Sequence, residues 1–185
     1  GSTDMRDLLG GKGVGLAEMS AAELPVPPGF TITTEACNAY NQSGEEFPPG
    51  MWDQTMEALR EVEREAGKRF GDSANPLLVS VRSGAKVSMP GMMDSILNLG
   101  LNGDAVQGIA RTSGNERFAQ DSYRRFIQMF GRIVLNVSGE AFDEILEKAK
   151  QRTGASLDTD LTVAPLEEVV RQFLSLVKKE TGTEF

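Results

Sequence analysis

The sequence predicts an α+β protein in which a mixed α/β half precedes a small bundle of helices. Seven of its eight prolines fall within residues 1–102, where short apolar runs alternate with helical patterns. After residue 102 only Pro165 remains, and apolar residues recur at helical spacing. A chain of 185 residues is long enough for one ordinary domain or two small ones. We therefore expect an α/β part at residues 3–102 and a helical part at residues 103–185.

The first expected element is a helix that follows a glycine-rich turn at residues 10–15. The prolines of residues 25–28 then predict an extended connector, because each proline fixes its own φ and disfavours a helical residue before it. Residues 30–33 (FTIT) are a short strand candidate, and Thr33 or Thr34 can cap a helix that runs to about Tyr40.

Three further elements complete the expected α/β half. An apolar stripe with spacings of four and three predicts an amphipathic helix over residues 50–66, ended by Gly67. Residues 76–83 (PLLVSVRS) read as a buried strand, and residues 95–101 (SILNLGL) as another. The stretch between them, residues 85–94 (AKVSMPGMMD), is too rich in Gly, Pro and Met for regular structure.

Four helices are expected in the second half, and their apolar faces predict that they pack as a bundle. Residues 104–111 form a short helix and residues 115–137 a long one. Apolar positions mark the other two helices. These are Phe142, Ile145, Leu146 and Ala149 for the third, and Leu166, Val169, Val170, Phe173, Leu174 and Val177 for the fourth.

Composition excludes several classes of function. The net charge of -8 argues against general nucleic-acid binding, which needs a basic surface, although a small phosphate ligand needs only a local positive field. The absence of histidine excludes Ser-His-Asp and Cys-His catalysis and any zinc site that uses imidazole. A single cysteine, Cys37, excludes an internal disulfide, and with no histidine to activate it we expect a packing residue rather than a nucleophile.

Other features of the sequence bear on the cellular location of the protein. The sequence contains no run of about eighteen apolar residues, so no membrane span is predicted. No signal peptide is visible, and the lone cysteine fits a reducing compartment, so we expect a cytoplasmic protein. Gly1-Ser2 is typical of the scar left by tag removal, so we expect the natural start, and any targeting segment with it, to be missing.

The first candidate site is the run from Gly10 to Gly15. Glycines let the backbone approach a ligand closely, and the following helix would direct its free N–H groups and positive dipole end toward an anion. Lys12 adds a full positive charge there. The run lacks the P-loop pattern, and a glycine-rich turn with a solvated lysine is the alternative.

The second candidate is Arg82, which ends the expected strand and precedes Ser83 and Gly84. Its guanidinium can hold two phosphate oxygens at once, and Ser83 and the Gly84 amide can add hydrogen bonds. Ligands commonly bind at such strand ends in α/β folds. The alternative is an arginine that forms a surface ion pair.

Two further segments carry weaker signals. Residues 88–94 (SMPGMMD) suit a mobile apolar lid over phosphates, the alternative being a methionine-filled gap in the core. Asp94 could bind magnesium, but an isolated aspartate is more often a cap or turn residue.

Four arginines lie near one face of the long helix. This face is either exposed to solvent or a docking face for another domain. They are Arg117, Arg124, Arg125 and Arg132.

Together these segments resemble the N-terminal region of the pyruvate, phosphate dikinases. The matching stretches occur in the family's order and cover nearly the whole chain. They are MRDLLGGKGVGLAEM, LPVPPGFTITTEAC, NPLLVSVRSGAKVSMPGMMDSILNLGL and NERFAQDSYRRFIQMFG. The phosphoenolpyruvate synthase branch is the nearest alternative, and Gly13 together with the SMPGMMDS loop favours the dikinases.

The resemblance implies an ATP-grasp-like subdomain followed by an inserted helical subdomain, in an enzyme that converts ATP, phosphate and pyruvate to AMP, pyrophosphate and phosphoenolpyruvate. Lys12 matches the family's phosphate-binding lysine and Arg82 its phosphate-binding arginine, and both are expected to act in catalysis. Expected nucleotide contacts come from these two and their neighbours and from the lid. They are Gly11, Lys12, Gly13, Arg82, Ser83, Gly91 and Met93.

The same resemblance implies that other parts of the enzyme are absent here. These are the family's first strand, the remaining ATP-grasp subdomain with the magnesium ligands, the phosphohistidine domain, the pyruvate barrel and the surfaces of a homodimer. We therefore expect a phosphotransferase fragment that is inactive alone, cytoplasmic, or plastidic if from a plant. The alternative is a free-standing nucleotide-binding or regulatory module.

Overall fold

The computed structural model describes residues 3–84 and 94–185. They form two compact units that are not continuous in sequence. The first contains the described residues up to Lys68 together with residues 82–84 and Asp94, and the second contains residues 69–81 and 95–185. This division by packing differs from a boundary at residue 102, because the strands before that residue pack with the helices after it. For domains defined by function, the boundary at residue 102 stays a prediction.

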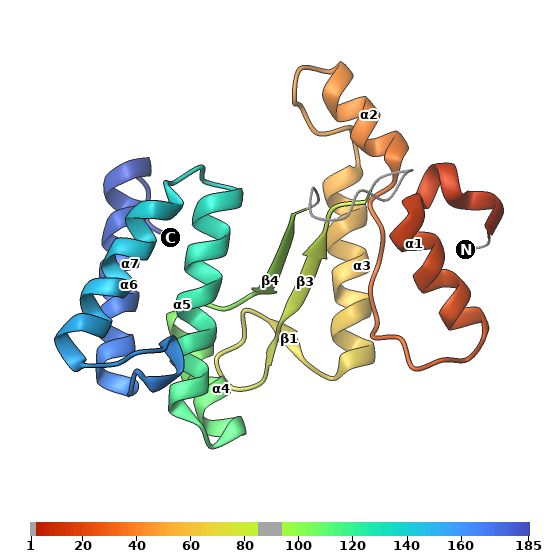
Figure 1. Ribbon diagram of the computed structural model, residues 1–185. Coiled ribbons are helices and arrows are strands. Elements are labelled where there is room, and N and C mark those ends of the chain that lie inside the picture. The colour runs from red at the N-terminus through yellow and green to blue at the C-terminus, as the bar shows by residue number, and fades with distance from the viewer. Residues whose placement is uncertain (1–2, 85–93) are drawn as a thin grey trace. The chain divides into compact units, whose positions relative to one another are not determined.

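The regular structure in the described part of the first unit is helical. The exception is Arg82, which is the last residue of a strand. An extended connection joins the end of helix α1 to the start of helix α2 (Figure 1). The elements are η1 (Thr3–Met5), α1 (Arg6–Ala21), α2 (Thr34–Gln42) and α3 (Met51–Ala66).

Helix α1 contains the glycine run, which was expected to form a turn. Gly11, Gly13 and Gly15 are helical, and only Gly10 departs from helical geometry, with φ of 69° and ψ of 171°. Gly10 is also buried, and a positive φ strains every residue except glycine. The glycine turn expected over residues 10–15 is therefore limited to Gly10. The chain is kinked at this residue, and the helix begins again at Gly11.

The next two helices are confirmed. Thr33 caps α2, since its hydroxyl accepts a hydrogen bond from the Ala36 amide at 3.4 Å. The Thr34 hydroxyl donates to the Asp7 carbonyl at 2.6 Å, which fastens α2 to α1. Helix α3 ends at Gly67, which adopts the left-handed conformation that favours glycine after a helix. Cys37, expected as a packing residue, is exposed on α2.

The strand expected at residues 30–33 is absent. The segment runs without helix or turn from Pro25 to Thr33, but its backbone pairs with no other described strand. The extended conformation itself was predicted correctly from the prolines of residues 25–28. A strand also needs a neighbour, and none of the described residues supplies one.

The second unit contains two small pairs of strands. In the first, β1 (Arg69–Phe70) runs parallel to β2 (Pro76–Leu77). Asp72 organises the turn between them, because its Oδ1 accepts hydrogen bonds from the Ala74 and Asn75 amides, both at 2.7 Å. The Asn75 and Ala74 amides lower the pKa of Asp72, because they stabilise its charged form.

In the second pair, β3 (Val79–Arg82) lies beside β4 (Ser95–Leu99), as Figure 1 shows. The strand at 95–101 is confirmed. The single buried strand expected at 76–83 is wrong, because it is interrupted at Leu78. Only its first part is buried, since Val81 in β3 is 46% exposed.

All four expected helices are present in the second unit. They are α4 (Gly103–Ser113), α5 (Glu116–Ile133), α6 (Gly139–Thr153) and α7 (Val163–Thr181), with a short η2 (Asp158–Asp160) before the last. Helix α5 ends four residues before the expected position at Val137. The Val137 amide donates instead to the Gly131 carbonyl at 2.9 Å, and Asn136 has a positive φ. None of the described helices has the length and hydropathy that a bilayer span requires.

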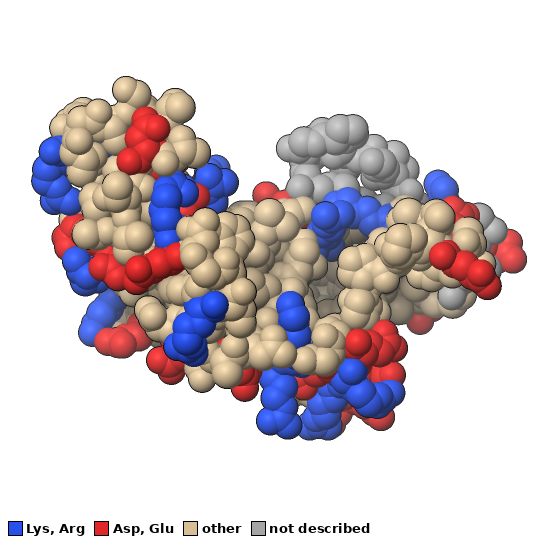
Figure 2. Space-filling view, turned by 90° about the horizontal axis from the view of Figure 1, so that it is seen from below, with Lys and Arg blue, Asp and Glu red and all other residues tan. Residues whose placement is uncertain are grey.

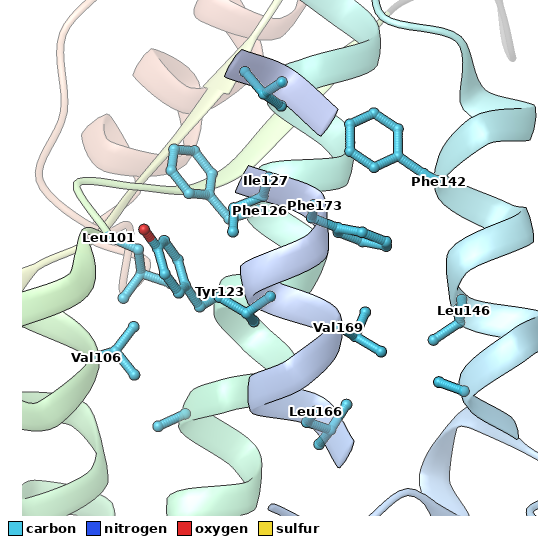
Figure 3. Packing of buried hydrophobic residues seen from close by; sticks show 14 of the residues in the cluster. Leu101, Val106, Tyr123, Phe126, Ile127, Phe142, Leu146, Leu166, Val169 and Phe173 are labelled. Atoms are coloured by element: carbon cyan, nitrogen blue, oxygen red, sulfur yellow. The ribbon is translucent and has the colours of Figure 1, made fainter. Parts of the chain in front are cut away.

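The hydrophobic core lies among these helices (Figure 3). Helix α5 packs against α4, α6 and α7, and β4 also lies on it. Phe142 of α6 and Phe173 of α7 are both fully buried, and their rings meet edge to face with centroids 4.8 Å apart. The apolar periodicity of the sequence therefore identified the core-facing sides of these helices correctly.

The arginines of α5 do not form a common docking face. Arg124 is only 2% exposed, and its Nη2 contacts Asp121 at 2.7 Å and Asp158 at 3.4 Å. Arg117 donates to the carbonyls of Leu161 and Asp158, at 2.8 and 2.9 Å. These two side chains hold the segment around η2 against α5. Helical spacing alone could not distinguish this internal use from a solvated face.

We predict that Gly131→Ala destabilises the second unit. A Cβ atom at this position would lie 2.6 Å from Phe142 Cζ, a ring that is itself fully buried. Overpacking of this kind costs about 1 to 3 kcal/mol. This exceeds the stabilisation expected from the higher helix propensity of alanine. Urea unfolding measures the change. The control is Gly103→Ala, where the new Cβ meets no atom within 4 Å and stability should be equal or slightly higher.

We also predict that Arg124→Met lowers the free energy of unfolding by about 3 kcal/mol, because it leaves the buried Asp121 carboxylate without its closest partner. The matched control is Arg171→Met, which removes an i,i+3 pair with Glu168 whose arginine is 63% exposed. Exposed pairs contribute little, so this variant should unfold like the parent chain. Equal unfolding midpoints for both variants would show that the buried network does not hold η2.

Candidate phosphate-binding site

Gly10 positions the first part of the site. Because its backbone is not helical, a new helical segment begins at Gly11, with Lys12 and Gly13 in its first turn. The first N–H groups of a helix have no acceptor within that helix, and its dipole is positive at this end. The glycine run thus presents a helix N-terminus, as the sequence predicted, although through one kinked residue and not a loop.

Gly13 lies where a side chain would not fit. A Cβ atom there would be 3.0 Å from Leu9 Cβ and 3.3 Å from Thr31 Oγ1. The extended segment before α2 therefore packs closely on this turn. Nothing in the spacing of the two segments along the sequence indicates that Thr31 contacts the glycine run.

Lys12 connects the glycine run to the second candidate segment. Its Nζ donates a hydrogen bond to the Ser83 carbonyl at 2.8 Å, across 71 residues of sequence, and both residues are exposed. Two segments that were proposed separately as phosphate sites are therefore adjacent in space. The ammonium group lies on the carbonyl of the residue that directly follows Arg82.

Arg82 is the last residue of β3 and its side chain is exposed. Within residues 3–84 and 94–185 it forms no ion pair and no side-chain hydrogen bond, so the alternative of a surface ion pair has no support in the described part of the chain. A guanidinium free of carboxylates can accept an anionic ligand without first losing a partner. Lys12 and Arg82 together give the site two positive charges in a chain whose net charge is -8.

Ser83 is held by Asp94 from the start of the second strand. The Ser83 amide donates to the Asp94 carbonyl at 3.2 Å and the Ser83 hydroxyl to the same atom at 3.0 Å. The only hydroxyl proton of Ser83 is thereby used, so a bond from it to phosphate would require the hydroxyl to rotate. Asp94 acts here through its main chain, which its side-chain chemistry did not reveal. Gly91 and Met93, with the other expected lid residues before Asp94, lie outside the described residues.

Figure 2 shows basic and acidic side chains interspersed on the face in view. Among the described residues, no group of three or more Asp, Glu or Cys side chains is placed to hold a metal ion. No magnesium ligand is assigned.

A pocket of about 490 Å³ lies elsewhere, within the second unit. Its walls are mainly apolar and include five aromatic rings. These are Phe70, Tyr123, Phe126, Phe130 and Phe185. The ionisable side chains on its wall are those of Glu184 and Tyr123, and burial raises the pKa of Tyr123, which keeps it neutral. Without a lysine or arginine, this pocket does not suit a phosphate.

Comparisons with known proteins show which enzymes the chain resembles. The sequence model of a family described as "Pyruvate phosphate dikinase, AMP/ATP-binding domain" matches residues 6–63, which include the glycine run and Lys12. The chloroplastic pyruvate, phosphate dikinase of Flaveria pringlei is 53% identical over all 185 residues, which cover 19% of that protein. The dikinase of Clostridium symbiosum is 52% identical over the whole chain, and dikinase 2 of Zea mays 50%, with 21% of each covered.

The identity extends over both compact units and is not confined to the glycine run. The chain spans about a fifth of the length of the relatives it matches. Over its whole length it is therefore similar to one segment of the pyruvate, phosphate dikinases.

Proposed function

We propose that this chain supplies part of the ATP site of a pyruvate, phosphate dikinase, in which Lys12 and Arg82 bind the phosphates that undergo transfer. The observation that carries the proposal is the hydrogen bond from Lys12 to the Ser83 carbonyl, because it places two positive side chains on adjoining segments. The matching family is described by its AMP/ATP-binding domain, which supports a nucleotide as the ligand.

Each side chain has a distinct part in this proposal. An ammonium group has three donors, so Lys12 can bind a phosphate oxygen and keep its bond to Ser83. Arg82 presents a planar fork that can bind two oxygens of one phosphate. The amides of Gly11 and Gly13, in the first turn after Gly10, add neutral donors to an anion.

Phosphoryl transfer depends mainly on positioning and on neutralising the negative charge of the transferred group and of the leaving oxygen. Lys12 and Arg82 can do both, and the same contacts would hold ATP before transfer. We assign the acceptor histidine, the magnesium ligands and most of the adenine pocket to parts of the enzyme outside this chain, along with the pyruvate barrel and the dimer surface. The first unit then corresponds to part of an ATP-grasp-like subdomain, with Gly91 and Met93 in a lid over the phosphates. The enzyme would act in the cytoplasm or a plastid.

In the complete enzyme, Lys12→Ala and Arg82→Ala should each slow phosphorylation of the acceptor histidine by about a hundredfold or more, as expected for the loss of a charged transition-state contact. Single-turnover labelling with β-labelled ATP measures this step. Lys148→Ala is the matched control, because that side chain is 74% exposed on α6 in the other unit, and labelling should stay at the parent rate. Parent-like labelling in both site variants would refute the assignment.

The 185-residue chain alone should fold, yet neither hydrolyse ATP nor transfer its phosphate at a useful rate. Only one side of a triphosphate site is present, so inorganic phosphate should bind with Kd of about 1 mM, equivalent to about 4 kcal/mol. Calorimetric titration with Mg-ATP and with phosphate tests this, and the Lys12→Ala, Arg82→Ala double variant should bind neither. Binding of Mg-ATP tighter than about 10 µM would favour a free-standing nucleotide-binding module instead.

A further inference from the structure

The aromatic pocket of the second unit has the size of a small-molecule site. Its volume of about 490 Å³ lies within the range of roughly 300–1,000 Å³ that is typical of such sites. All of its wall residues belong to the second unit, so the pocket is a feature of that unit alone. The phosphate site proposed above uses none of these residues. The pocket is therefore a candidate site for a ligand of its own.

Three phenylalanine rings form one part of the wall, and each contacts the other two. The centroid of Phe185 lies 5.5 Å from that of Phe126 and 5.5 Å from that of Phe130, and both contacts are edge to face. Phe126 and Phe130 are tilted against each other, with centroids 5.7 Å apart. Aromatic rings that meet in such arrangements gain more than the burial of their surface alone provides. This wall therefore favours a planar aromatic ligand.

Tyr123 gives the pocket a polar group that has no partner. Its side chain is only 7% exposed, and its hydroxyl forms no hydrogen bond with any residue that the structure describes. Figure 3 shows its ring beside Leu101 and Phe126, which line the same pocket. Among the described residues no enclosed side-chain oxygen lacks a partner, so the Tyr123 hydroxyl adjoins open space, and the pocket supplies that space. A ligand with a hydrogen-bond acceptor would satisfy this buried donor.

Other polar groups on the wall are already engaged. The Glu184 carboxylate accepts a hydrogen bond from Lys178 Nζ at 2.6 Å, and the Thr181 hydroxyl donates to the Val177 carbonyl at 2.8 Å. The side-chain oxygen of Asn102 accepts two amide hydrogen bonds at the start of α4. A cationic ligand would have to displace Lys178, and an anionic ligand would find no lysine or arginine on the wall. The pocket therefore selects a neutral molecule.

We propose that this pocket binds a neutral, planar aromatic molecule that carries one hydrogen-bond acceptor, such as a ring ketone. The Tyr123 hydroxyl donates to the acceptor, and the rings of Phe126, Phe130 and Phe185 pack on the ligand. The proposal depends only on residues of the second unit, and it does not require Lys12 or Arg82 to bind phosphate.

Two probes that differ in a single group test the proposal. Fluorenone and fluorene share a frame of three fused rings, and only fluorenone has a carbonyl oxygen. Equilibrium dialysis against excess 185-residue chain measures both affinities at low ligand concentration. Fluorenone should bind with Kd of about 100 µM or tighter, an ordinary affinity for a ligand of this size. Absence of binding by fluorenone would overturn the proposal.

The variant Tyr123→Phe removes the donor and keeps the ring. It should weaken the binding of fluorenone about fivefold or more and leave that of fluorene unchanged, because only fluorenone can accept the hydrogen bond. The variant should fold like the parent chain, since the hydroxyl has no partner among the described residues. Tyr40→Phe is the matched control, because Tyr40 is the other tyrosine of the chain and does not line the pocket. Unchanged affinity for fluorenone in Tyr123→Phe, or equal losses for both probes, would contradict the proposal.

The same dialysis with the polypeptide extended to the length of its relatives tests whether the pocket is open in the longer enzyme. Fluorenone should bind there with the same affinity, and Mg-ATP should not displace it. Loss of binding would show that the rest of the polypeptide covers the pocket. Displacement by Mg-ATP would show that the pocket belongs to the nucleotide site. Either result would overturn the proposal, and neither would bear on the roles of Lys12 and Arg82.

Discussion

Burial around helix α5 is the constraint on which most of the ordered structure depends. Helices α4, α6 and α7 and strand β4 all pack on it, and the buried Arg124 on its polar side holds the η2 segment through Asp158. Strand β4 in turn pairs with β3, whose last residue is Arg82. Strand β3, which ends at the proposed phosphate ligand Arg82, is therefore held in place by its pairing with β4.

The sequence predicted α3 and the four helices of the second unit because each has an apolar stripe. Thr33 and Gly67 are located where the cap rules place them, and the core residues of α6 and α7 follow the expected spacing. Strands were predicted less well. Residues 30–33 have the composition of a strand, but pairing requires a neighbour that a local pattern cannot reveal. The interruption at Leu78 and the internal use of Arg124 likewise depend on tertiary contacts.

The residues of the candidate site were predicted one by one, but their proximity in space was not. Glycine content and charge pointed to Lys12, and position at a strand end pointed to Arg82. Their adjacency, through the Ser83 carbonyl, follows only from the fold. Two details had no signal in the sequence. These are the packing of Thr31 on Gly13 and the role of the Asp94 carbonyl, which holds both the amide and the hydroxyl of Ser83. Both depend on the path of the main chain, which cannot be predicted from the residue types alone.

The central claim is that the glycine turn and the end of β3 form one phosphate site. Amide chemical-shift mapping of the 185-residue chain during titration with inorganic phosphate and then Mg-ATP tests it most directly. The account predicts that the amides of Gly11, Lys12 and Gly13 shift together with those of Ser83 and Gly84, with one common affinity. Shifts confined to only one of these two segments, or centred on the aromatic pocket around Leu99 and Tyr123, would contradict it.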